Sequence, residues 1–124
     1  MATSYYLHSA IPYVNAAPHI GHAQEFVYAD TVRRYHTLLG KNVAYLSGAD
    51  ENALKIVQAA EKANMNPQAF CDLHQKEFLD VSEKLNVHFD YWQRGTDRKH
   101  HASAQKLWEL CLSLLCVFFF SLLQ

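Results

Sequence analysis

The stretch that most constrains the fold is residues 11–22, IPYVNAAPHIGH, which joins two segments of different periodicity. Residues 5–11 form a short apolar and aromatic run that is typical of a buried strand. Residues 19–39 carry the pattern of a long helix, and Gly40 is a usual C-terminal stop. A strand that enters a helix through such a loop directs the free N–H groups of the first helical turn at the loop. Because that end of a helix favours anions, we expect a ligand site here.

The rest of the chain continues the alternation of strands and helices. Residues 42–47 predict a second strand, and residues 53–63 predict a helix. Asn66 and Pro67 are typical of a helix start, and the apolar spacing that follows carries this helix to about residue 86. Residues 87–92 predict a short third strand, and Thr96 or Asp97 caps a last helix. Strand, helix and strand in this order predict a right-handed crossover, and hence a parallel sheet in a three-layer α/β domain.

Bulk properties narrow the class of protein. A chain of 124 residues with half of them apolar has room for one globular core. The net charge of −1 argues against a broad nucleic-acid surface on this chain. The three cysteines lack C-x-x-C spacing, which predicts neither a zinc site nor a disulfide framework. No basic or amphipathic leader precedes the first strand, so we expect a cytoplasmic protein.

The loop and helix start carry a resemblance to a known family. His19-Ile20-Gly21-His22 resembles the HIGH signature of class I aminoacyl-tRNA synthetases. The segments Ile11-Pro12-Tyr13-Val14-Asn15 and Gly48-Ala49-Asp50-Glu51-Asn52 are similar to those of methionyl-tRNA synthetases. The resemblance spans about residues 4–111 and implies the first half of a Rossmann-like parallel sheet. It also implies a methionine–tRNA ligase, an enzyme that forms methionyl adenylate from methionine and ATP.

The resemblance assigns roles to seven positions. It makes His19 and His22 catalytic, and it places Asn15, His19, Gly21 and His22 on ATP. The implied methionine contacts are Ile11, Tyr13 and Asp50. Gly21 would let a base or ribose approach the backbone closely. Asp50 follows the second predicted strand, where ligands of open α/β sheets bind, and it would hold the ammonium group of methionine.

Each role has a structural alternative. The two histidines are also explained as a helix cap and a solvated neighbour. Asp50 is also suited to cap the following helix, a role compatible with ligand binding. Ile11 and Tyr13 are equally suited to ordinary core packing. His74, His100 and His101 lack ligand spacing and are expected to be solvated, and no metal site is predicted. Where many family members have His-Gly, this chain has Asn52-Ala53, and Asn52 would donate in place of the histidine.

The implied activity needs more than these residues provide. The chain has no Lys-Met-Ser-Lys-Ser loop, and the resemblance implies that tRNA binds through regions absent from it. ATP with Mg²⁺ is the implied cofactor, with no zinc site in this chain. Two alternatives stay open: a small H-x-G-H adenylyltransferase, which the length favours, and a non-catalytic remnant.

The composition changes at residue 111. Residues 111–124 have no charged side chain, so every charged residue lies within residues 1–110. The family resemblance lies in residues 1–110 as well. The apolar run is shorter than the roughly 20 residues of a membrane helix, so no membrane partner is expected. We interpret residues 1–110 as half of a catalytic domain and residues 111–124 as a non-family tail, the mark of a truncated or frameshifted product.

Overall fold

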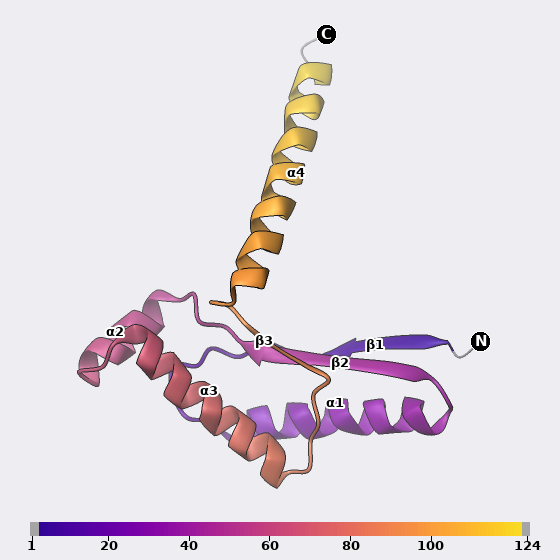
Figure 1. Cartoon of the computed structure of the whole chain (residues 1–124), viewed down its shortest axis with the longest axis vertical. Helices are drawn as coiled ribbons and strands as arrows, with labels where there is room; N and C mark the ends of the chain where they lie inside the picture. The colour runs from indigo at the N-terminus through magenta and orange to yellow at the C-terminus, as the bar shows by residue number, and fades with distance from the viewer. Residues whose placement is uncertain (1–2, 123–124) are drawn as a thin grey trace.

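The computed structural model describes the backbone of residues 3–122 and the side chains of residues 3–114. Three strands and four helices follow one another along the chain (Figure 1). In order they are β1 (Ser4–His8), α1 (Ile20–Leu38), β2 (Asn42–Ala49), α2 (Leu54–Lys62), α3 (Pro67–Lys84), β3 (Tyr91–Arg94) and α4 (Arg98–Leu122). The predicted α/β class is confirmed.

The three strands form one parallel sheet in the order β1-β2-β3. In the first pair Ser4 lies opposite Asn42 and His8 opposite Leu46, whereas β3 begins opposite Leu46, at Tyr91. The first two strands are therefore parallel neighbours with α1 as their crossover, as predicted.

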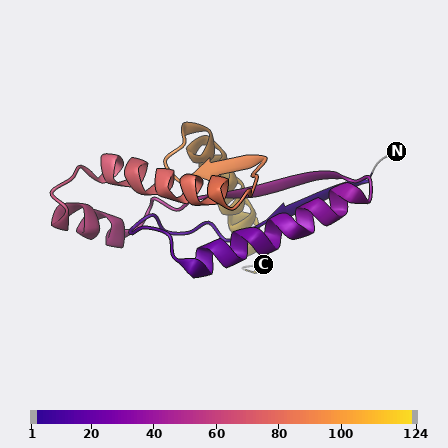
Figure 2. The ribbon, with the colours of Figure 1, turned by 90° about the horizontal axis from the view of Figure 1, so that it is seen from below.

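Two of the helices cover one face of the sheet. Helices α1 and α3 lie on the same side of it, and α4 points away from the sheet on the other side (Figures 1 and 2). Along β1 the side chains alternate, with Tyr5 and Leu7 half-buried and Tyr6 61% exposed. The described part of the chain thus has two layers rather than the predicted three, and β1 is buried on one face only. The aromatic composition of β1 concealed this, because the exposed Tyr6 is aromatic like the half-buried Tyr5.

The core lies between the sheet and helices α1 and α3. The rings of Phe26 and Phe78 join the two helices, with centroids 6.4 Å apart, and Phe89 lies 5.2 Å from Phe26 and 5.0 Å from Tyr45. Tyr45, Phe26, Phe78 and Ile56 are almost fully buried. Burying side chains of this size contributes about 1.5–3 kcal/mol each, so this contact holds α1 and α3 against the sheet.

Two strand boundaries differ from the prediction. The strand predicted over 5–11 ends at His8, although Tyr13 rejoins β2 in a single bridge to Asp50. Residues 9–12 thus lie opposite only residues 47–49, which is a one-residue bulge. The strand predicted over 87–92 is Tyr91–Arg94 in the structure. The side-chain carboxylate of Asp90 accepts the backbone N–H of Tyr45 (2.9 Å) in place of a backbone carbonyl, so the strand begins only after Asp90.

Helices α3 and α4 begin directly after the residues that the sequence predicted as their caps. The Asn66 side chain accepts the N–H of Gln68 (2.9 Å) at the start of α3, and Asp97 accepts that of Lys99 (2.7 Å) at the start of α4. Helix α4 runs through residue 111 without a break. The boundary between residues 1–110 and 111–124 therefore stays a prediction. Among the described residues, no helix combines the length and apolar character that crossing a membrane requires.

Candidate functional site

The start of α1 is built by two histidines that cap the same turn. His19 is the N-cap, and its Nδ1 accepts the N–H of Gly21 at 3.1 Å. The Nδ1 of His22 accepts the N–H of His19 at 3.2 Å, which completes a reciprocal capping box. The two rings stack with centroids 3.9 Å apart. Both imidazoles therefore have a structural role. The alternative weighed above had only one of them as a cap and the other as a solvated neighbour.

This capping determines which nitrogen of each ring carries the proton. A backbone N–H can only donate, so each Nδ1 is unprotonated, and a neutral ring then carries its proton on Nε2. Burial of the ring lowers the pKa of His22, and the neighbouring His19 lowers it further. The charge of Glu25 raises this pKa but does not offset the other two effects. Each ring thus has one N–H donor left, at Nε2, for a ligand.

The expected free backbone at this helix start is partly occupied. The N–H of Gly21 is held by His19, so it is not a vacant anion donor. A Cβ on Gly21 would lie 2.9 Å from Cε1 of His19, which means that the imidazole fills the space expected for a base or ribose. A side chain at position 21 would therefore require the His19 ring to move. An anion would meet imidazole N–H groups rather than the backbone of Gly21.

Asp50 lies at the carboxyl end of β2. Its N–H donates to the carbonyl of Pro12 (2.9 Å), and its carbonyl accepts from Val14 (3.4 Å). Its Oδ1 accepts the N–H of Asn52 at 3.1 Å. The N-cap of α2 is Ala53, which has no side-chain cap, so Asp50 does not cap this helix. Among the described residues Oδ2 has no hydrogen-bond partner, and Asp50 forms no ion pair.

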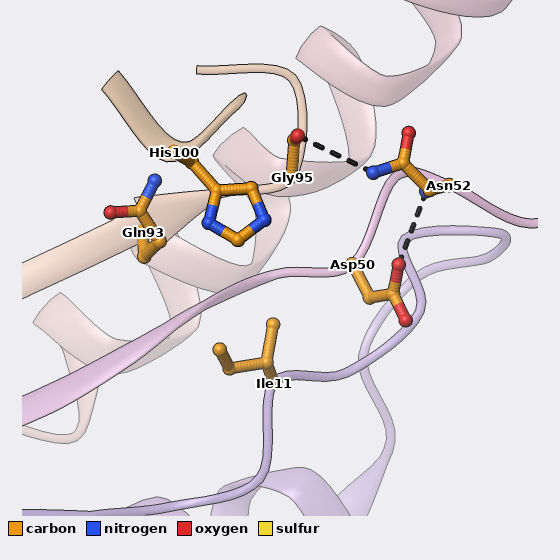
Figure 3. Close-up of a pocket in the computed structure, with 6 residues that line it drawn as sticks. All are labelled: Ile11, Asp50, Asn52, Gln93, Gly95 and His100. Atoms are coloured by element: carbon orange, nitrogen blue, oxygen red, sulfur yellow. Dashed lines mark hydrogen bonds between the residues drawn. The ribbon is translucent and has the colours of Figure 1, made fainter. Parts of the chain in front are cut away.

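A cavity of about 240 Å³ opens beside Asp50. Figure 3 shows the side chains around it, with Asp50 and Ile11 on one side and the end of β3 and the start of α4 on the other. Its lining residues are Ile11, Asp50, Asn52, Gln93, Gly95 and His100. The cavity combines one carboxylate with apolar surface, which suits a small ligand that has a cationic group and an apolar side chain.

Some predicted site residues come together, and others do not. Ile11 lines the cavity with Asp50, and Tyr13 is joined to Asp50 by the bridge between their backbones. Ile11 and Tyr13 are 41% and 44% exposed, which disagrees with plain core packing. The Nζ of Lys55 lies 4.8 Å from the centroid of the Tyr13 ring, a cation–π contact that the sequence did not indicate.

The predicted ATP residues lie outside this cavity. The start of α1 and the end of β2 are at the same end of the sheet (Figure 1), as in any parallel strand–helix–strand unit. None of Asn15, His19, Gly21 and His22 lines the cavity, and Asn15 is half-buried in the bend after Val14. Their assignment to ATP stays a prediction.

Sequence reasoning missed one wall of the cavity, which is lined by Gln93, Gly95 and His100. His100 and His101 are exposed, as expected, whereas His74 is half-buried. The ring of His101 lies 2.9 Å from the carbonyl of Gly95, and His74 is 2.7 Å from the carboxylate of Glu77. The Asp97 cap was the available signal, because it places the next turn of α4 directly after β3. Within the described residues, no group of three or more His, Cys, Asp or Glu residues is placed to hold a metal ion.

Comparison with known proteins decides the family. The family described as tRNA synthetases class I (M) matches residues 5–114, most of the chain. The chain belongs to this family. It is 41% identical over 104 residues to a methionine–tRNA ligase of Mycobacterium bovis and 40% identical over 105 residues to one of Mesorhizobium japonicum. These matches cover 84% and 85% of the chain, which spans about a fifth (20%) of the length of each relative.

Solved structures agree with this assignment. The methionyl-tRNA synthetase of Mycobacterium tuberculosis, solved in complex with methionyl-adenylate, superposes with a TM-score of 0.84 at 39% identity. The match covers 86% of this chain and 21% of that one. A leucyl enzyme in complex with tRNA, from Agrobacterium radiobacter, has a TM-score of 0.79 at 22% identity and shows the fold alone. The chain thus has the Rossmann-like fold of class I synthetases, and the comparisons do not favour the small adenylyltransferase.

Proposed function

We propose that this chain forms the methionine pocket and part of the triphosphate site of a methionine–tRNA ligase. The observation that supports this most is the Asp50 carboxylate, which forms no ion pair within residues 3–114 and lies beside Ile11 in a cavity at the ends of the parallel strands. In the relatives' class of reaction, the carboxylate of methionine attacks the α-phosphate of ATP to give methionyl adenylate. The methionyl group then passes to tRNA.

The amino-acid end of the site is the cavity beside Asp50. The free oxygen of Asp50 would accept hydrogen bonds from the ammonium group of methionine, a charge-assisted contact. Ile11 offers apolar surface in the same cavity, and Tyr13 offers a half-exposed ring on which a thioether could rest. Asn52 donates to the carbonyl of Gly95 (3.3 Å), so it would shape the cavity rather than contact the ligand.

The phosphate end is the start of α1. The Nε2–H groups of His19 and His22 would donate to the triphosphate of ATP as negative charge builds up during the transfer. Gly21 would leave space for the His19 ring, because it has no side chain. Asn15 would contribute a further hydrogen-bond donor from the loop. Mg²⁺ would accompany ATP and offset part of its charge; we assign no residue of this chain to the metal.

The remaining assignments concern the setting of this site. Residues 1–110 would contribute to the catalytic domain, and the tRNA would bind through parts of the relatives' length that this chain does not span. We place the activity in the cytoplasm, because protein synthesis consumes its product there.

A chimera tests the amino-acid end of this proposal. Residues 4–110 of this chain would replace the matching segment of the Mycobacterium tuberculosis enzyme, and methionine-dependent exchange of pyrophosphate into ATP would be measured. Removing a charge-assisted contact costs about 1.5–3 kcal/mol, so Asp50→Ala should raise the KM for methionine at least tenfold. The KM for ATP should stay unchanged. An active chimera in which Asp50→Ala leaves the KM for methionine unaltered would contradict the assignment.

The same chimera tests the phosphate end. His22→Ala removes a donor that is needed in the transition state, so it should lower kcat for exchange by about 10²-fold with little change in the KM for methionine. His74→Ala is the matched control, because His74 is a half-buried histidine of α3 that pairs with Glu77 away from the cavity. If both variants lose kcat equally, His22 acts through stability alone.

A further inference from the structure

The residue next to Asp50 is a carboxylate with a different environment. The side chain of Glu51 is fully buried, with 0% of it exposed. Its Oε1 accepts from Nε (2.9 Å) and Nη2 of Arg94, and its Oε2 accepts from the N–H (2.9 Å) and the hydroxyl of Thr96. Both oxygens are occupied by protein donors. Glu51 therefore has no room for a ligand, in contrast to Asp50.

These contacts join segments that are distant in the sequence. Glu51 follows β2, Arg94 ends β3, and Thr96 lies in the turn before α4. Arg94 also pairs with Asp72 of α3. Burial by itself raises the pKa of Glu51, but the hydrogen bonds from Arg94 and Thr96 outweigh it and leave this pKa lowered. The carboxylate is thus charged and paired, and one buried anion connects two strand ends and a helix.

The connection holds the two walls of the cavity at a fixed spacing. Gly95 lies between the two partners of Glu51, and its N–H donates to the carbonyl of Ala49 at 3.0 Å. A Cβ on Gly95 would lie 3.2 Å from the backbone nitrogen of Glu51, so the turn packs directly on the end of β2. Asn52 and His101 both contact the carbonyl of Gly95 (3.3 and 2.9 Å). The hydrogen bond from Asn52 is visible across the cavity in Figure 3.

We propose that Glu51 is a positioning residue for the amino-acid pocket. Through Arg94 and Thr96 it sets the distance between the wall that carries Asp50 and the wall that carries Gly95 and His100. A primary ammonium ligand held by Asp50 then meets a cavity of fixed width for its apolar side chain. This inference rests on the proposed function for the identity of the ligand, whereas the connection between the walls stands without it.

The first experiment measures the connection in the full 124-residue chain. Amide hydrogen exchange would be followed by NMR at Gly95, with the amide of Phe78 in the middle of α3 as the internal reference. Glu51→Gln keeps the shape of the side chain but removes its charge, so Gly95 should exchange at least tenfold faster relative to Phe78. Asp30→Asn is the matched control, because Asp30 is also a buried carboxylate paired with an arginine, Arg34 (2.6 Å), away from the cavity.

The second experiment uses the chimera described above. A pocket that is no longer held in its binding geometry loses affinity, so Glu51→Gln should raise the KM for methionine roughly tenfold, with kcat and the KM for ATP unchanged. Thr96→Val keeps the ion pair and removes only the hydroxyl, so it should give a smaller rise if Glu51→Gln does not fold. Asp30→Asn should lower stability without changing the KM for methionine.

The outcomes separate the two proposals. An unchanged relative exchange rate at Gly95 in Glu51→Gln would overturn the inference, and so would an unchanged KM for methionine in a folded, active Glu51→Gln chimera. Equal changes in Glu51→Gln and Asp30→Asn would reduce Glu51 to a stability residue and would also overturn it. If instead Asp50→Ala leaves the KM for methionine unaltered, the proposed function fails, while faster exchange at Gly95 still supports the connection between the walls.

Discussion

His19 and His22 together cap the first turn of helix α1, each by accepting a backbone N–H at its Nδ1. Their rings stack with centroids 3.9 Å apart. The HIGH tetrapeptide is therefore a helix cap before any ligand arrives. Capping and ligand binding do not compete, because they use opposite nitrogens of each ring. The cap orients the two Nε2–H donors in advance, which is how a rigid site lowers the cost of binding.

The cap predicts a loss of stability in acid. Because the pKa of His22 is lowered in the folded chain, the unfolded chain binds more protons, and stability rises with pH. The contribution of His22 is complete above its ordinary pKa of 6.5 and is lost as the pH falls through the lower folded value. Protonation would also put a proton on Nδ1, which then could not accept the N–H of His19.

Urea unfolding at several pH values measures this effect. The pKa of His36 is lowered too, first by burial and then by Lys41, so the chain must be compared with a variant. His22→Asn keeps an acceptor but does not titrate. The free energy of unfolding of the wild-type chain should exceed that of the variant by more at pH 7.5 than at pH 5, values chosen on either side of the ordinary histidine pKa of about 6.5. A difference that stays constant across this range would contradict the effect.

Gly21→Ala should destabilise the chain, although alanine is the better helix former by about 0.8–1 kcal/mol. The new Cβ would lie 2.9 Å from the His19 ring and would force that ring to leave the N–H of Gly21. Loss of an N-cap costs up to about 2 kcal/mol, which exceeds this gain.

The sign of the change makes this test decisive. Thermal unfolding would compare Gly21→Ala with Gln24→Ala, an exposed substitution in the next turn of the same helix that should be neutral or slightly stabilising. A Gly21→Ala chain that melts above the wild type would show that the His19 cap contributes little.

Local signals predicted much of this fold. The Asn66-Pro67 start of α3, the strand–helix–strand order and the parallel pairing all depend on neighbouring residues, and all are found. The ends of β1 and β3 depend instead on distant partners. Asp90 takes the N–H of Tyr45, 45 positions away, and nothing in the sequence around either residue indicates this.

The same reasoning applies to the site. The family resemblance assigned Asp50 its role, and its position after a parallel strand supports a ligand site there. Glu51 looked like an ordinary neighbour, because its partners Arg94 and Thr96 are 43 and 45 positions further along the chain. The structural role of the two histidines was weighed beside the catalytic one, and the capping box supplies it. A helix start can be predicted from sequence, but which nitrogen it uses cannot.

The last prediction concerns the 124-residue chain by itself, which should make no methionyl adenylate at a useful rate. Charge that develops on the triphosphate needs donors from both sides, and each lost donor typically costs about 10²–10³ in rate. This chain offers the imidazoles of His19 and His22 on one side and has no Lys-Met-Ser-Lys-Ser loop for the other. Methionine-dependent exchange of pyrophosphate into ATP, run on the purified chain beside the active chimera as a positive control, measures this. Robust exchange by the chain that His22→Ala abolishes would show that the first half of the site suffices.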